Sequence, residues 1–174
     1  HMNLIMLGLF SLNIQGIEGS IVQMISHGVV SSALFLCVGV MYDRYHSRLL
    51  KYYSGLTHTM PLFIFLFLLF SFANAALPGT CNFVGEVMLF TGIFLDNIFV
   101  TIFAALGIIL SGAYSLWLFN RIAYGNIKIQ YISNFSDLSR REFAILFPLA
   151  FLTIFLGVYP EILINKFHLV NVYS

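Results

Sequence analysis

The feature that most constrains this chain is an apolar segment from about Pro61 to Leu95 that contains one formal charge, Glu86. As a single α-helix, these roughly 35 residues would measure about 50 Å. A bilayer core is only about 30 Å thick, and about 20 residues suffice to cross it. The pair Pro78-Gly79 lies near the middle of the segment, and proline both lacks a backbone N–H and clashes with the preceding helical turn. We therefore predict a membrane-spanning helix that is broken at Pro78-Gly79, with Glu86 about two turns beyond the break.

A broken helix needs partners for the backbone groups that it frees. Pro78 deprives the carbonyl of Asn74 of its helical partner, and an unsatisfied carbonyl in hydrocarbon costs several kcal/mol. Polar side chains cluster around the break at Asn74, Thr80 and Asn82. We expect these side chains to satisfy the freed groups.

The composition is that of an integral membrane protein. The chain is 60% hydrophobic and 9% charged, with a mean hydropathy of +0.93, whereas ordinary soluble domains are about 25% charged. The net charge of +1 does not indicate a nucleic-acid partner. Cys37 and Cys81 both lie in apolar segments, which argues against a disulfide framework or a zinc site.

The remaining apolar segments predict an all-α fold in a single domain, residues 1–174. We expect about four transmembrane helices plus a partial one, because the apolar stretch at 1–13 is too short to cross a bilayer alone. A turn is predicted at Asp96-Asn97, and Ser136–Ser139 offers N-cap residues for the last helix. Besides the broken helix, the predicted full spans are 15–43, 98–121 and 143–163.

The basic residues are distributed unevenly between the predicted loops. If the spans alternate, loops 44–60 and 121–142 lie on the same side of the membrane. All Lys and Arg residues except Lys166 lie in these two loops, namely Arg44, Arg48, Lys51, Arg121, Lys128, Arg140 and Arg141. The positive-inside tendency places such loops in the cytoplasm or the mitochondrial matrix.

Two polar patterns occur within the predicted spans. Ser20, Gln23, His27 and Ser31 recur at helical spacing on one face, and such a stripe must contact protein or water because lipid cannot satisfy it. Gly107, Ser111 and Ser115 form a ladder of small residues that allows another helix to approach closely. Ser111 fits a plain packing role equally well.

Glu86 is the strongest candidate for chemistry. Acidic residues inside a membrane commonly mark ion or proton pathways, and a carboxyl group in such surroundings can exchange protons near neutral pH. The alternative is a structural carboxyl that holds helices together through hydrogen bonds or an ion pair with a lysine. His27 is the second candidate, because imidazole gains and loses a proton near neutral pH, although a core histidine satisfied by a neighbouring helix is an equal alternative. No second histidine lies four residues from His27, so we predict no metal site.

Several motifs resemble one known family. The runs Ser26–Phe35, Leu77–Glu86, Tyr42–Arg44 and Phe135–Glu142 are similar to the C-terminal part of the subunit-4 family of respiratory complex I, within the antiporter-like superfamily. The likeness covers essentially all of the chain. It implies the second half of a subunit built from two inverted helical repeats, comprising the end of helix 10 and helices 11 to 14, with the broken helix as helix 12.

The resemblance also implies a function. Glu86 is similar to the family's helix-12 carboxylate on the central proton path, His27 to the helix-11 histidine and His1 to the helix-10 histidine. The chain would then be part of a proton-pumping subunit of NADH:ubiquinone oxidoreductase in the mitochondrial inner membrane, with loops 44–60 and 121–142 facing the matrix. The family's glutamate on helix 5 and lysines on helices 7 and 8 have no counterpart here, so this chain alone would not translocate protons.

The partners implied by the resemblance are the N-terminal part of the same subunit, neighbouring membrane-arm subunits and lipids, with no nucleic acid. No cofactor is expected in this chain, since NADH, FMN, iron–sulfur clusters and ubiquinone would bind other subunits. The alternatives are an Mrp-type cation/proton antiporter subunit, which shares the Glu and His motifs, and a structural membrane subunit without a proton path of its own.

Overall fold

The computed structural model describes residues 1–126 and 136–166. Lys128, one of the predicted loop cations, lies outside the described residues. Every regular element in the described part of the chain is helical, which confirms the predicted all-α class. The longer helices are α1 (Met2–Phe10), α2 (Ile14–Tyr45), α4 (Pro61–Asn74), α5 (Cys81–Asp96), α6 (Ile98–Ala123) and α8 (Arg140–Val158), and a 3-10 turn (Leu50–Tyr52) and α3 (Leu56–Thr59) lie between α2 and α4.

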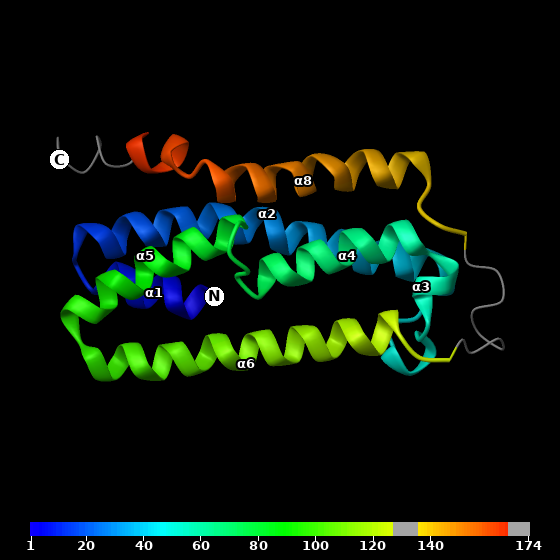
Figure 1. Cartoon of the computed structure of the whole chain (residues 1–174), viewed down its shortest axis with the longest axis horizontal. Helices are drawn as coiled ribbons and strands as arrows, with labels where there is room; N and C mark the ends of the chain where they lie inside the picture. The colour runs from blue at the N-terminus through cyan, green and yellow to red at the C-terminus, as the bar shows by residue number, and fades with distance from the viewer. Residues whose placement is uncertain (127–135, 167–174) are drawn as a thin grey trace.

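The helices form an elongated bundle (Figure 1). Three of them, α2, α6 and α8, are long and apolar enough to cross a membrane by length and composition. The shorter α4 and α5 follow one another along the bundle, so that together they make the predicted broken span (Figure 1). Helix α1 is much shorter, with 9 residues against 26 in α6, and the N-terminus lies inside the length of the bundle (Figure 1).

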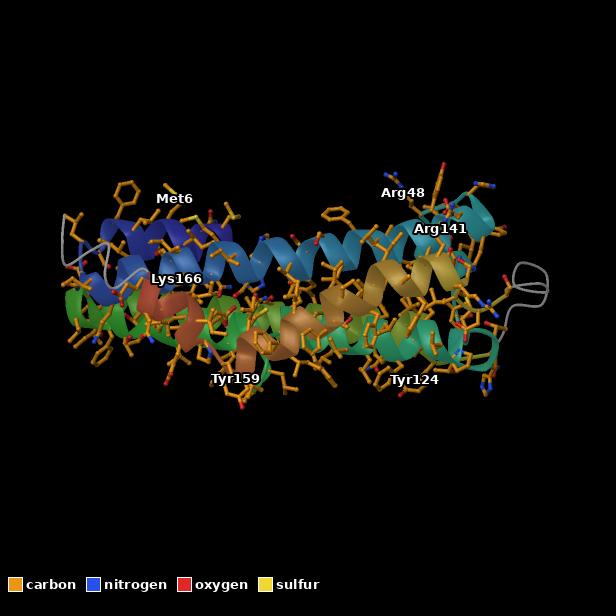
Figure 2. The ribbon with its side chains drawn as sticks, turned by 90° about the horizontal axis from the view of Figure 1, so that it is seen from above. Met6, Arg48, Tyr124, Arg141, Tyr159 and Lys166 are labelled. Carbon is orange, nitrogen blue, oxygen red and sulfur yellow. The ribbon has the colours of Figure 1, made fainter. Side chains whose placement is uncertain are left out.

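The two ends of the bundle differ in charge. The connection from α2 to α4, the end of α6 and the start of α8 lie at one end, and the turns before α2 and α6 lie at the other (Figure 1). Arg48 and Arg141 accordingly lie at one end, whereas Lys166 lies toward the opposite end (Figure 2). The two basic loops thus share one end of the molecule, as the sequence predicts.

The break between α4 and α5 has a defined backbone structure. Helix α4 ends at Asn74, and Ala76 adopts a left-handed conformation with φ 54°. The Leu77 N–H donates to the Phe72 carbonyl and the Ala76 N–H to the Ala73 carbonyl, at 3.0 and 3.2 Å. This is the Schellman pattern that ends many helices. The helix therefore ends before Pro78 is reached, and proline prevents it from resuming at once.

Of the polar side chains predicted to satisfy the backbone at the break, Thr80 makes a hydrogen bond there and Asn82 does not. The Thr80 hydroxyl donates to the Leu77 carbonyl at 2.8 Å, as expected. Asn82 is completely buried, yet its amide has no hydrogen-bond partner among the described residues. The expectation that the Asn82 side chain satisfies the break is therefore wrong, and the Schellman bonds satisfy the carbonyls of Phe72 and Ala73.

Glycines allow α2 and α5 to pack closely. Gly16 faces Gly92, and a Cβ atom on Gly92 would lie only 2.5 Å from the Gly16 Cα. Gly19 packs in the same way on the backbone of Leu89, with 2.7 Å between the position of its missing Cβ and the Leu89 nitrogen. Such contacts bring the two backbones together as in small-residue interfaces of membrane helices. The polar residues of α2 are thereby held against α5.

Two helix starts are capped by side chains, one at the predicted Asp96-Asn97 turn and one within the predicted N-cap segment Ser136–Ser139. The Asn97 side chain accepts hydrogen bonds from the backbone of Phe99 and Val100 at the start of α6. Ser139 and Glu142 form a reciprocal capping box at the start of α8, a motif that satisfies two free N–H groups. This box explains why α8 begins at Arg140, slightly earlier than the predicted span. Pro148 is accommodated inside α8.

Candidate functional site

The centre of the candidate site is a close pair between α1 and α5. The His1 Nδ1 atom lies 3.1 Å from Glu86 Oε1, and the two side chains are only 11% and 4% exposed. His1 is the N-cap residue of α1, and Glu86 lies in the second turn of α5. The pair therefore lies at the N-terminus, inside the length of the bundle (Figure 1).

Helix α2 contributes two further polar side chains to this pair. The Gln23 Nε2 atom lies 3.5 Å from the same His1 Nδ1, and Gln23 is completely buried. The ring of His27, one helical turn further along α2, lies with its centroid 5.5 Å from that of His1. His1 thus lies beside all three of Gln23, His27 and Glu86.

The arrangement matches the sequence expectations in part. The structure brings two of the predicted site residues, His1 and Glu86, into contact. His27 lies beside His1, and no contact between His27 and Glu86 is found in the described residues. The polar stripe of α2 faces protein in its first half, where Ser20 and Gln23 are fully buried, whereas His27 and Ser31 are half-buried.

Gln23 is a site residue that the sequence reasoning did not single out. Its position in the stripe, four residues before His27, was the available signal. That signal is weak because a buried glutamine is equally suited to joining helices through structural hydrogen bonds. Its proximity to His1 depends on the packing of α1 against α2, which the spacing along α2 does not encode.

A cavity of about 260 Å³ adjoins the pair, between α1, the end of α4, α5 and α6. His1, Glu86 and Asn74 line it from one side, and Ser111 of α6 lines it from the other. The Ser111 Oγ atom is buried and makes no hydrogen bond within the described residues, whereas Glu86 Oε1 is in contact with His1 Nδ1. The cavity therefore joins polar side chains from four helices.

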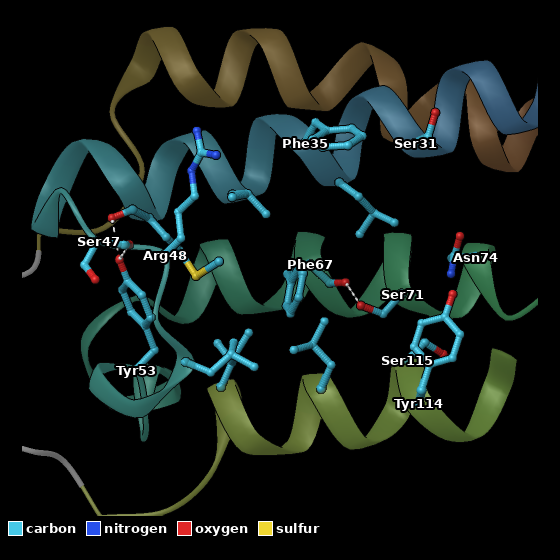
Figure 3. Close-up of a pocket in the computed structure, with 16 residues that line it drawn as sticks. Ser31, Phe35, Ser47, Arg48, Tyr53, Phe67, Ser71, Asn74, Tyr114 and Ser115 are labelled. Carbon is cyan, nitrogen blue, oxygen red and sulfur yellow. Dashed lines mark hydrogen bonds between the residues drawn. The ribbon is translucent and has the colours of Figure 1, made fainter. Parts of the chain in front are cut away.

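A second cavity, of about 330 Å³, lies between α2, α4 and α6 and is mainly apolar. Figure 3 shows Arg48 and Tyr53 at one end of it and Asn74 and Tyr114 at the other. The Tyr53 hydroxyl donates to the Ser47 carbonyl at 2.6 Å, and burial raises the pKa of this phenol, so it remains a donor. Asn74 lines both cavities and marks the boundary between them.

Within the described residues, no group of three or more His, Cys, Asp or Glu side chains is arranged to hold a metal ion. Cys37 and Cys81 are both free and buried. The chemistry that the described site itself can perform is therefore proton exchange between a carboxyl group, imidazole rings and water.

Comparison with known proteins identifies the family of this arrangement. Residues 1–111 match the family described as NADH:quinone oxidoreductase/Mrp antiporter, TM. The chain is 56% identical over 172 residues to NADH-ubiquinone oxidoreductase chain 4 of Chondrus crispus, covering 99% of this chain and 35% of that protein. It is 55% identical over 168 residues to the protein of the same name from Marchantia polymorpha, covering 97% and 34%. It is 48% identical over 162 residues to NADH-quinone oxidoreductase subunit M of Rhodobacter capsulatus, covering 93% and 32%.

The fold has a counterpart among solved structures. A chain of respiratory complex I from Thermus thermophilus with bound NADH matches with a TM-score of 0.89 and 27% sequence identity, over 97% of this chain and 35% of that chain. The present chain spans about a third of the length of these relatives. It belongs to the transmembrane family of NADH:quinone oxidoreductases and Mrp antiporters.

Proposed function

We propose that this chain is the C-terminal part of a proton-translocating membrane-arm subunit of NADH:ubiquinone oxidoreductase. Relatives named as chain 4 or subunit M of that enzyme are about half identical to it along nearly its whole length. Their names favour this enzyme over an Mrp-type antiporter. We place the chain in the mitochondrial inner membrane, since the first relatives in the comparison carry the ubiquinone oxidoreductase name.

The observation that carries this proposal is the 3.1 Å approach of His1 Nδ1 to Glu86 Oε1 inside the bundle. A carboxyl and an imidazole at this distance can transfer a proton directly. Burial of an isolated ionised group is costly, and His1 is the partner that the structure provides for the Glu86 carboxyl. The pair is therefore suited to gaining and losing protons in a coordinated manner.

Gln23 offers the His1 ring a second hydrogen-bond partner besides Glu86. A protonated His1 Nδ1 donates to Glu86, whereas a deprotonated Nδ1 is an acceptor and fits the amide N–H of Gln23 at 3.5 Å. The imidazole can thus find a partner in either state. We propose that Glu86 holds the proton, that His1 exchanges it and that Gln23 orients the His1 ring. His27, with its ring 5.5 Å from that of His1, is the next member of the path.

The rest of the path lies in other parts of the complex. Among the described residues, the arginines of α2 and α6 lie only in their last turns, so a cation that couples to Glu86 comes from elsewhere. We propose that the N-terminal part of the subunit supplies it and that neighbouring membrane-arm subunits and lipids cover the exposed apolar faces. NADH, FMN, iron–sulfur clusters and ubiquinone bind other subunits. Catalysis of electron transfer is thus not performed by this chain alone.

The orientation in the membrane follows from the charge distribution. Arg44, Arg48, Lys51 and Arg121 belong to the end of the bundle that carries the two long connections. Because loops rich in Lys and Arg remain on the side from which a membrane protein inserts, we propose that loops 44–60 and 121–142 face the matrix.

The proposal is tested by Glu86→Gln in the assembled complex, with Glu18→Gln as a matched control. Glu18 is also buried, at 5% exposed, but lies in the second turn of α2, and no contact with His1 or Glu86 is found in the described residues. We expect Glu86→Gln to assemble and to lose most proton translocation per NADH oxidised in sealed vesicles, while Glu18→Gln pumps normally. A normal proton-to-electron ratio in assembled Glu86→Gln would overturn the proposal, and cation-dependent proton exchange without NADH would favour the Mrp-type alternative.

A further inference from the structure

A groove between α2 and α8 lies away from the candidate site, at the end of the bundle where Arg141 is found (Figure 2). It measures about 350 Å³ and is lined by the last turns of α2 and the first two turns of α8. None of the described residues that line it also lines the cavity beside Glu86. The proposed proton exchange therefore leaves this groove unexplained.

The groove has an apolar floor. Val40 of α2 and Leu146 of α8 are 6% and 1% exposed and belong to the main buried cluster of the bundle. A Cβ atom built on Gly39, which also lines the groove, meets no other atom within 4 Å, so the space over this glycine is open. The lining part of α2, from Leu36 to Asp43, is about 10 Å long. The groove thus offers an apolar slot that runs inward from the ends of the two helices.

Charged side chains of opposite sign form the mouth of the groove, which comprises Asp43, Arg141 and Glu142. Glu142 is held by Arg44, whose guanidinium lies 2.9 Å from each of its carboxylate oxygens. Asp43 and Arg141 are exposed, and neither makes a hydrogen bond or an ion pair with another described residue. Within the described part of the chain, the mouth therefore carries one unpaired anion and one unpaired cation.

The helix termini reinforce this pattern of charge. Arg141 lies in the first turn of α8, and Asp43 lies in the last turn of α2. The N-terminus of a helix favours an anion, and the C-terminus favours a cation. A ligand with a phosphate beside Arg141 and an ammonium group beside Asp43 would therefore be stabilised by the side chains and by the backbone dipoles.

We propose that this groove binds phosphatidylethanolamine. One acyl chain lies over Gly39, the phosphate accepts hydrogen bonds from the Arg141 guanidinium, whose planar N–H groups match phosphate oxygens, and the ammonium group donates to the Asp43 carboxylate. A headgroup with only negative charge would be repelled by Asp43, and a choline headgroup has no N–H to donate. Because lipid tails are as apolar as leucine, the headgroup rather than the tail determines which lipid binds.

Photo-crosslinking in the assembled complex tests the groove. The complex is reconstituted into nanodiscs that contain phosphatidylethanolamine with a diazirine on one acyl chain, and labelled peptides are mapped by mass spectrometry. We expect label on the segments of α2 and α8 that line the groove, and severalfold less label there in Gly39→Leu. The matched control is Gly112→Leu in α6, where an added Cβ also meets no atom within 4 Å and which does not line the groove. Equal labelling in the two variants would overturn the inference, as would the absence of lipid label from these segments in the unaltered complex.

The headgroup assignment has its own comparison. Phosphatidylcholine and phosphatidylglycerol with the same diazirine-bearing chain should label the groove severalfold less than phosphatidylethanolamine does. Asp43→Asn should remove the preference for phosphatidylethanolamine, and Arg141→Gln should lower labelling by all three lipids. Asp96→Asn, which changes an exposed carboxylate at the start of the turn before α6, should leave the preference intact. Equal labelling by the three lipids in the unaltered complex would overturn the assignment.

The inference requires only that the chain lies in a membrane, as its family indicates, and does not depend on proton exchange. Glu86→Gln should therefore leave lipid labelling of the groove unchanged. A failure of the proposed function is read from proton translocation, and a failure of this inference is read from the labelled peptides. All variants are compared at equal assembly of the complex, measured by native electrophoresis.

Discussion

Gly157 of α8 packs directly onto the backbone of Gly79, at the break between α4 and α5. A Cβ atom on Gly157 would collide with the Gly79 carbonyl oxygen and would lie 2.6 Å from the carbonyl carbon of Thr80. Leu156, the preceding residue, packs against a buried cluster that includes Ala73 and Cys81 on the two sides of the break. Helix α8 therefore covers the break and holds it in place.

We expect Gly157→Ala to destabilise the structure around the break. Overpacking a close contact typically costs about 1–3 kcal/mol, which exceeds the gain of about 0.5–1 kcal/mol from replacing glycine by alanine in a helix. Gly39→Ala in α2 is the control, since its added Cβ meets no atom within 4 Å. The thermal transition of the solubilised complex should fall for Gly157→Ala only. An unchanged transition would mean that α8 readily moves away from the break.

A second expectation concerns the basic end of the bundle, where Arg44 joins α2 to α8. Its guanidinium donates to both carboxylate oxygens of Glu142, each at 2.9 Å, and also to the backbone carbonyls of Ser136 and Asp137. The Asp137 carboxylate in turn accepts from the first backbone N–H groups of α4. One arginine thus organises three helix ends.

We expect Arg44→Gln to destabilise the complex far more than Arg141→Gln, which changes an exposed neighbour. Exposed ion pairs contribute about 0–1 kcal/mol, whereas removing one partner of a buried pair costs about 3–5 kcal/mol. Because the side chains of Arg44 and Glu142 are only 12% and 14% exposed, the loss of stability in Arg44→Gln should be closer to the value for a buried pair. Arg44→Lys should rescue only in part, since lysine cannot make the bidentate contact. A double-mutant cycle with Glu142→Gln measures the coupling, and additive effects would show that the pair does not contribute.

The features that could be predicted from the sequence are those whose residues lie close together along the chain. The spans, the break, the turn at Asp96-Asn97 and the N-cap segment Ser136–Ser139 depend on residues within a few positions of each other, and local patterns predicted them. The left-handed conformation of Ala76 was not predictable, because glycine is the usual residue there. The pairing of Arg44 with Glu142 and the packing of Gly157 on Gly79 join distant parts of the chain, and no local pattern encodes them.

For the candidate site, single residues could be predicted from the sequence, but the contacts between them could not. Glu86 was identifiable as a lone charge in an apolar segment, and His27 as part of a polar stripe. The side chain nearest to Glu86 turned out to be His1, whose position depends on how α1 docks on α2 and α5. Gly8 makes that docking possible, since a Cβ at this position would lie 2.5 Å from the Ser20 hydroxyl oxygen. Such close packing is visible only in three dimensions.

The proposed orientation predicts which positions water-soluble reagents reach. Cysteines placed at Lys51 and Arg121 should be labelled by an impermeant thiol reagent only from the matrix side, and a cysteine at Asp96 only from the other side. The native Cys37 and Cys81 are buried and should give a low background. Labelling of Lys51→Cys from the outer face of intact inner membranes would reverse the orientation.

The last expectation links helix packing to the site through Gly85. A Cβ atom on Gly85 would collide with the Gln23 side-chain oxygen and would lie 3.0 Å from the Gln23 Cα and backbone nitrogen. Backbone atoms cannot move aside as a flexible side chain can, so Gly85→Ala should separate α5 from α2 and displace the Gln23 amide from His1. We expect a lower thermal transition together with reduced proton translocation.

The control for this variant is Gly28→Ala, whose added Cβ meets no atom within 4 Å although it lies in α2 next to His27. Gln23→Ala on its own separates the two consequences, because it removes the amide from His1 and leaves the backbone contact with Gly85 unchanged. If Gln23→Ala keeps its thermal transition but pumps less, then Gln23 orients His1 as proposed. If it pumps normally, then Gln23 is only a packing residue, and Glu86 and His1 exchange protons without it.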